Sequence, residues 1–113
     1  MSEPGGRAIR GHGNVVVAYV PDLMDRSKVS AAAPGTTFVG RPEALAEAAA
    51  GADVVVLDLS RPGVLDVLPL PGRVVGFASH VDRDTLDRAA AAGVEVMARS
   101  AFFRDPASIL TGT

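Results

Sequence analysis

Short runs of apolar and β-branched residues recur along the chain and predict five strands. The runs cover residues 15–20, 36–39, 54–57, 73–78 and 95–98. A run of this length is too short for a helix. The 54–57 run is also uniformly apolar, whereas a strand with one face in water would alternate apolar and polar residues. The pattern therefore predicts strands buried on both faces, as in a parallel sheet covered by helices.

The segments between these runs carry helix signals. Asp22 and Asp82 are each suited to cap a helix N-terminus, and Pro42 fits a first helical position. The predicted helices cover residues 23–33, 42–50, 83–92 and 104–110, with one poor helical turn within 63–68. Alternation of strands and helices with short connections favours right-handed crossovers and a three-layer α/β sandwich. We therefore expect a flavodoxin-like (βα)5 fold, with a parallel five-stranded sheet in the order 2-1-3-4-5.

Composition limits the function classes. The 113 residues suit one domain, expected over residues 14–113, after a Gly-rich polar leader over 1–13 that we expect to be disordered. The net charge of −2 gives no general attraction for nucleic acid or for an anionic membrane surface. No apolar run approaches the roughly 20 residues of a membrane span. The absence of Cys fits a reducing cytoplasm, and the Ala- and Arg-rich composition suggests a GC-rich bacterial genome.

An acidic residue ends the third predicted strand. Asp58 follows the 54–57 run directly, and open α/β sheets place their ligands at the carboxyl ends of the strands. An acid that abuts a fully apolar strand is costly unless it is solvated or paired, which favours a site over a simple turn cap. The stretch Asp58-Leu-Ser-Arg-Pro-Gly63 resembles the phosphoacceptor loop of two-component response-regulator receiver domains. The stretch from Arg73 to Gly93 is similar to their fourth strand and helix.

The resemblance implies a definite chemistry. In receiver domains the Asp, here Asp58, attacks a phosphohistidine or a small phosphodonor. Two acids after strand one hold Mg²⁺, while a Ser or Thr after strand four and a Lys after strand five bind the phosphoryl oxygens. This chain has only Asp22 as a metal candidate, after Val-Pro, and it has Ala78 followed by Ser79 at the hydroxyl position. Arg99 stands at the Lys position, and its planar fork is a different ligand from a point ammonium.

Each site residue has a second interpretation. Asp22 either caps the helix that follows or binds a metal. Asp25 is better explained as a first-turn partner of the helix dipole than as a ligand. Arg99 either pairs with Asp58, as a mimic of an occupied site, or is simply solvated. Ser79 and Arg99 are the candidates for contact with a phosphoryl group.

The altered site favours a stand-alone receiver-like regulatory domain, not an enzyme, that acts through protein contacts. The expected partner is a protein, such as a histidine kinase or a second copy of the chain. The expected partner surface contains Arg83, Thr85, Arg88, Phe102 and Phe103. Adjacent rings on an extended segment diverge, so one Phe is expected to be exposed.

Two alternatives stay open. One is a phosphorylation-competent response regulator with Asp58 as acceptor, and Mg²⁺ is implied as a cofactor only in that case. The other is a small α/β enzyme or ligand-binding module that uses the same cleft. The low aromatic content of 4% argues weakly against a stacking pocket for a nucleobase or flavin.

Overall fold

A five-stranded parallel sheet forms the centre of the protein. The computed structural model describes residues 15–111, and the sheet has the order β2-β1-β3-β4-β5. The strands are β1 (Val16–Tyr19), β2 (Thr37–Phe38), β3 (Val54–Asp58), β4 (Arg73–Ala78) and β5 (Glu95–Ala98). All four neighbouring pairs are parallel. The expected α/β class and strand order are confirmed, and the topology is consistent with a flavodoxin-like fold.

Helices connect the strands, and two of them begin at capping acids. The elements are α2 (Leu23–Ala32), η1 (Pro42–Ala44), α3 (Leu45–Ala49), η2 (Leu65–Val67), α4 (Arg83–Ala91), α5 (Arg99–Arg104) and α6 (Pro106–Thr111), where η marks a 3₁₀ turn. The Asp22 carboxylate accepts hydrogen bonds from the amides of Met24 and Asp25 at 2.9 and 3.0 Å. Asp82 accepts from the Thr85 amide at 3.3 Å. Both predicted N-caps are confirmed, because each carboxylate satisfies amides that have no intrahelical partner.

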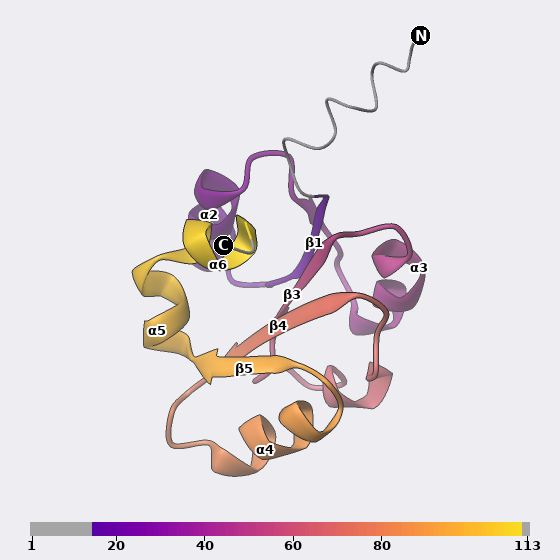
Figure 1. The fold of residues 1–113 in the computed structure, drawn as a ribbon, viewed down its shortest axis with the longest axis vertical. Coiled ribbons are helices and arrows are strands. Elements are labelled where there is room, and N and C mark those ends of the chain that lie inside the picture. Colours follow the sequence, from indigo (N-terminus) through magenta and orange to yellow (C-terminus); the bar gives the residue numbers. More distant parts are fainter. Residues whose placement is uncertain (1–14, 112–113) are drawn as a thin grey trace, which may run out of the picture.

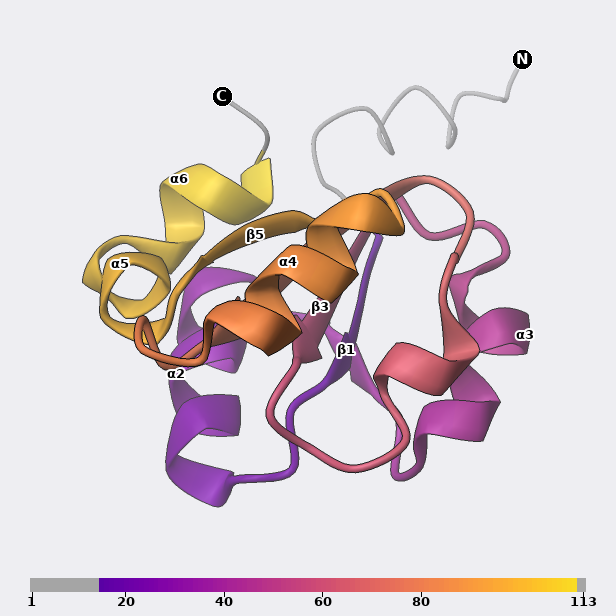
Figure 2. The ribbon, with the colours of Figure 1, turned by 90° about the horizontal axis from the view of Figure 1, so that it is seen from below.

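The sheet divides the core into two apolar clusters. Successive strand residues point to opposite faces, so Val17 of β1 lies in the cluster under α3 and α4, whereas Val16 lies in the cluster under α2, α5 and α6. Figure 1 shows α2, α5 and α6 gathered on one side of the sheet and α3 and α4 on the other. Figure 2 shows α4 crossing in front of the strands of the sheet. Every residue of β1 and β3 is buried, as expected for strands covered on both faces.

The C-terminal part of the chain differs from the sequence prediction. We expected an extended segment up to residue 103 and a helix over 104–110, but α5 begins at Arg99, directly after β5, and α6 begins at Pro106. Phe102 is fully buried, and Phe103 is half-buried. Both rings pack on Phe77, with centroids 4.9 and 5.0 Å away. The expectation of a substantially exposed ring is therefore wrong, because adjacent residues on a helix are not turned to opposite sides as they are on a strand.

Two expectations concern the chain ends and the membrane. The leader expected over residues 1–13 falls outside the described residues, as do residues 14, 112 and 113 of the expected domain. Within residues 15–111, no helix combines the length and the apolar character needed to cross a membrane.

Arg73, at the start of β4, links the edge strand β5 and helix α6 through hydrogen bonds. Its Nε and Nη2 atoms donate to the Glu95 carboxylate of β5 at 2.9 and 3.0 Å, and its Nη1 atom donates to the Ile109 carbonyl of α6 at 2.6 Å. The two-point contact with Glu95 suits the planar guanidinium. The Arg73 hydrogen bond is the main cause that holds the pKa of Glu95 below its usual value.

Replacing Glu95 by Gln is expected to lower the free energy of unfolding at pH 7 by less than about 1 kcal/mol, since the pair is partly exposed. A carboxyl with a depressed folded-state pKa stabilises the fold above its unfolded-state pKa of about 4.3, and this contribution is lost as the pH falls through the lower folded-state pKa. Urea denaturation should therefore show a difference between the two proteins at pH 7 that closes below about pH 4.

Glu47→Gln is the control for this measurement, since Glu47 makes no ion pair with another residue in the described range. A difference at Glu95 that persists at low pH, or an equal effect at Glu47, would contradict the assignment.

Candidate functional site

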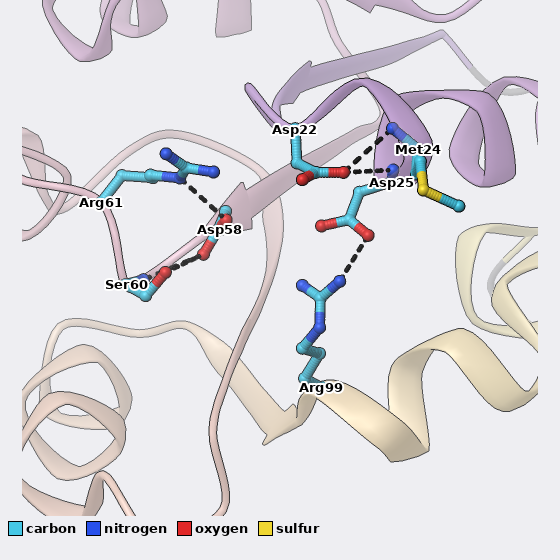
Figure 3. A network of polar contacts seen from close by, with 7 residues as sticks. All are labelled: Asp22, Met24, Asp25, Asp58, Ser60, Arg61 and Arg99. Atoms are coloured by element: carbon cyan, nitrogen blue, oxygen red, sulfur yellow. Dashed lines mark hydrogen bonds and ion pairs between the residues drawn. The ribbon is translucent and has the colours of Figure 1, made fainter.

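The carboxyl edge of the sheet collects three carboxylates. Asp58 is the last residue of β3, and it continues the alternation of Val54 and Val56, whose side chains face α2 and α5. Asp22 and Asp25 lie at the start of α2, which follows the neighbouring strand β1. Figure 3 shows the three carboxylates together with Arg61 and Arg99. The topology alone produces this gathering, because parallel strands end at the same edge.

Asp58 is buried, with an exposed fraction of 3%. Its Oδ1 atom accepts from the Ser60 amide at 3.1 Å and from the Ser60 hydroxyl at 2.6 Å, and its Oδ2 atom accepts from Arg61 Nε at 3.3 Å. Both oxygens thus have partners from the loop that follows, although Oδ2 keeps a second lone pair unused by these bonds. The position of Asp58 at the strand end agrees with the sequence prediction.

A glycine in the next strand shapes the turn beyond Asp58. The Leu59 amide donates to the Phe77 carbonyl at 2.9 Å, so the chain stays beside β4 for one residue more. The Leu59 side chain then lies over Gly76, where an added Cβ atom would stand 2.8 Å from the Leu59 Cγ and Cδ1 atoms. A side chain at position 76 would therefore force the buried Leu59 side chain to shift. Gly76 thus makes room for the Leu59 side chain at the start of the loop that carries Ser60 and Arg61.

Asp22 is exposed and is used by the helix. The amide of Asp25 is the main cause that lowers the pKa of Asp22, and the Met24 amide, Arg99 and Arg61 lower it further. Of the two interpretations of Asp22, the N-cap is therefore observed. Among residues 15–111, no group of three or more Asp, Glu, His or Cys side chains is arranged to hold a metal ion.

Arg99 pairs with Asp25. Its Nη2 atom lies 2.5 Å from Asp25 Oδ1, and the Asp25 side chain is only 3% exposed. The hydrogen bond with Asp25 is the main cause that raises the pKa of Arg99, with Asp58 and Asp22 contributing through their charges. The considered pairing of Arg99 with Asp58 is wrong as a direct contact, because Arg61 reaches Asp58 from its own loop while α2 brings Asp25 to Arg99.

The sequence interpretation of Asp25 as a mere dipole partner missed this role. The signal was present: Asp25 precedes the buried Val29 by four residues, so the two share the inward face of α2. A buried acid of this kind requires a cation.

The remaining candidates make no hydrogen bond or ion pair with Asp58 in the described part of the chain. Ser79 is exposed, and its hydroxyl accepts from the Val81 amide at 3.4 Å, so it helps to shape the loop after β4. Arg83 and Arg88 are exposed on α4, where they pair with Asp87 and Asp84 at 3.4 and 3.7 Å. The structure thus places Asp22, Asp58 and Arg99 at one edge, and Ser79 follows the end of β4 there. Of the candidate partner residues, Arg83, Thr85 and Arg88 lie on α4, whereas Phe102 and Phe103 lie on α5.

Comparison with family models, curated proteins and solved structures gives no match. The fold assignment therefore depends on the sheet topology itself. The resemblance to receiver domains stays a prediction that depends on the residues around Asp58.

Replacing Arg99 by Gln is expected to lower the free energy of unfolding at pH 7 by roughly 2–4 kcal/mol, because it leaves the buried Asp25 carboxylate without its cation. Arg99→Lys keeps the charge and should lose less. The double variant Asp25→Asn with Arg99→Gln should recover part of the loss, since no unpaired charge remains. Urea denaturation of the parent, the two single variants Arg99→Gln and Asp25→Asn, and the double variant measures the coupling. An Arg99→Gln protein as stable as the parent chain would refute the importance of the pair.

Proposed function

We propose that this chain is a receiver-like regulatory domain that acts through protein–protein contacts, with a phosphorylation site that has degenerated. The observation that carries the proposal is the ion pair between Arg99 and Asp25. In receiver domains a Lys at the corresponding position contacts the phosphoryl group. Here the Nη2 atom of the cation at that position is bound to the buried Asp25 carboxylate, so Asp25 fixes where the guanidinium lies and neutralises its charge.

The metal side of the chemistry supports the same proposal. Phosphoryl transfer depends on cations positioned to stabilise the charge of the transferring group. Pro21 stands where a second acid would be expected, and Asp22 is engaged by the first amides of α2. A Mg²⁺ ion would have to compete with Arg61 and Arg99 for the carboxylates at this edge. The proposed setting is the bacterial cytoplasm, since the absence of Cys from the sequence fits a reducing compartment and the Ala- and Arg-rich composition fits a GC-rich bacterial genome.

The proposed output surface is the exposed face of α4 with the adjoining end of β5 and α5. Arg83 and Arg88 lie there together with Asp84 and Asp87, and such a mixed-charge surface suits a charged protein partner, such as a histidine kinase or a second copy of the chain. Phe102 is buried and does not contribute to this surface, and Phe103 is only partly exposed.

A phosphorylation-competent regulator is the second candidate function. The observation in its favour is that Asp58 remains at the strand end, with a hydroxyl from Ser60 and a cation from Arg61 beside its carboxylate. Under this alternative, Asp58 would accept a phosphoryl group despite the changes at Pro21 and Arg99.

Incubation with acetyl phosphate and Mg²⁺, followed by intact-mass measurement, separates the two candidates. We expect no adduct on the parent chain, because each missing stabilising group costs on the order of 10²-fold in rate. The variant that combines Pro21→Asp with Arg99→Lys supplies a second acid and an ammonium. It should gain an adduct at least about 10²-fold faster.

Asp58→Asn in the combined variant is the matched control and should abolish the adduct, and circular dichroism checks that each variant is folded. A stoichiometric phosphate adduct on the parent chain, absent in Asp58→Asn, would overturn the proposal in favour of the competent regulator.

A further inference from the structure

A polar cavity lies between the loop after β3 and helix α4, next to the Asp58 site but separate from its carboxylate. Its volume is about 250 Å³, and its polar lining includes Ser60, Arg61, Asp66, Thr85 and Arg88. Pockets for drug-sized ligands usually measure about 300–1,000 Å³, so this cavity suits a smaller group. Two of the lining side chains are arginines that come from different elements, the β3 loop and α4.

Several hydrogen-bond donors around the cavity are unused. Arg61 donates through Nε to Asp58, but its terminal nitrogens have no partner among residues 15–111. The Thr85 hydroxyl likewise makes no hydrogen bond within that range, although the Thr85 amide is bound to Asp82. Arg88 approaches Asp84 only at 3.7 Å, and both side chains are largely exposed, so this pair is weak. The cavity therefore presents two guanidinium groups and a hydroxyl that lack strong acceptors.

The unused N–H groups of the arginines favour an anion, whereas the charges themselves are balanced. Asp58 and Asp84 partner Arg61 and Arg88 from outside the lining, and Asp66 is the acid of the lining. Guanidinium groups match the oxygens of a phosphate in geometry and donate several hydrogen bonds at once. An anion can reach these donors from solvent, because Arg88 is exposed and Arg61 is half-buried.

We propose that this cavity binds the phosphate group of a small phosphorylated molecule or inorganic phosphate, held by Arg61 and Arg88 with the Thr85 hydroxyl. The site lies beyond the proposed regulatory function and does not depend on it, since Asp58 need not be phosphorylated for the cavity to bind an anion.

The helix α4 offers a matched control for testing the site. Arg83 and Arg88 lie on the same helix, both are exposed, and each pairs with an acid four residues away. Only Arg88 lines the cavity. Arg88→Gln and Arg83→Gln therefore change the net charge equally and differ in whether they touch the site.

Titration with inorganic phosphate and with O-phosphoserine, followed by two-dimensional ¹H–¹⁵N NMR at constant ionic strength, tests the proposal. We expect saturable shifts at the amides of Ser60, Gly63 and Thr85. Arg88→Gln should weaken binding roughly tenfold, as for the loss of a charge-assisted hydrogen bond. Arg83→Gln should leave the affinity nearly unchanged, and Asp66→Asn should raise it by removing a like charge.

The two ligands distinguish the sources of the phosphate group. Tighter binding of O-phosphoserine supports the site as one for a phosphate on a larger organic molecule, and equal or tighter binding of inorganic phosphate supports it as one for the free anion. Absence of saturable shifts with both ligands, or equal weakening by Arg83→Gln and Arg88→Gln, would overturn the proposal.

Discussion

Burial of the central strands on both faces is the constraint from which the rest of the structure follows. β1 and β3 have no wet face, so a charged side chain in either strand has no room except at an end. Asp58 occupies such an end, and the first turn of α2 brings Asp22 and Asp25 to the same edge. The buried strands thus restrict Asp58 to this edge, and the connection from β1 to α2 adds Asp22 and Asp25. The cations that balance the acids come from the loop after β3 and from the start of α5.

Arg99 supplies the cation for the buried Asp25 and links α2 to α5. Its guanidinium bonds the buried carboxylate of α2 while it lies 5.7 and 5.0 Å from the ring centres of Phe77 and Phe103. The half-exposed side chain is therefore held by a charge on one side and by aromatic rings on the other. Since Arg99 is the first residue of α5, the ion pair joins the start of α2 to the start of α5 across the carboxyl edge. A change in the charge of Asp25 would therefore act on the first residue of α5.

The sequence was most informative where local chemistry decides the outcome. The bounds of β4 and β5 and the caps Asp22 and Asp82 were all predicted, because apolar runs and capping acids act within a few residues. The start of α5 was missed, since no Gly, Pro or capping side chain separates it from β5. Pro106, placed inside the predicted helix, in fact begins α6, as its fixed φ angle and missing donor favour.

The pairing within the site could not be predicted for a different reason. Asp25 and Arg99 are 74 residues apart, and several acids compete for each arginine. The choice between them depends on the reach of each side chain from its backbone. Arg61 binds Asp58, which lies only three residues before it in the chain. Arg99 binds Asp25 instead, the acid on the buried face of α2. Sequence patterns identified the groups at the edge, but only packing in three dimensions determined the partners.

Arg61 occupies a position between the two sites proposed for this edge. One side of its guanidinium donates to Asp58, and the residue also lines the cavity next to α4. A single cation shared by two acceptors couples them. An anion bound in the cavity would weaken the interaction of Arg61 with Asp58. Because coupling between two sites is reciprocal, neutralisation of Asp58 would strengthen anion binding to the same extent. The 3.3 Å contact with Asp58 involves only one nitrogen of the Arg61 guanidinium. Arg61 could therefore bind an anion in the cavity through its other nitrogens while it keeps its contact with Asp58. The charge balance of the carboxyl edge is thus joined to the surface of α4 through one side chain, independently of the Arg99 pair that joins it to α5.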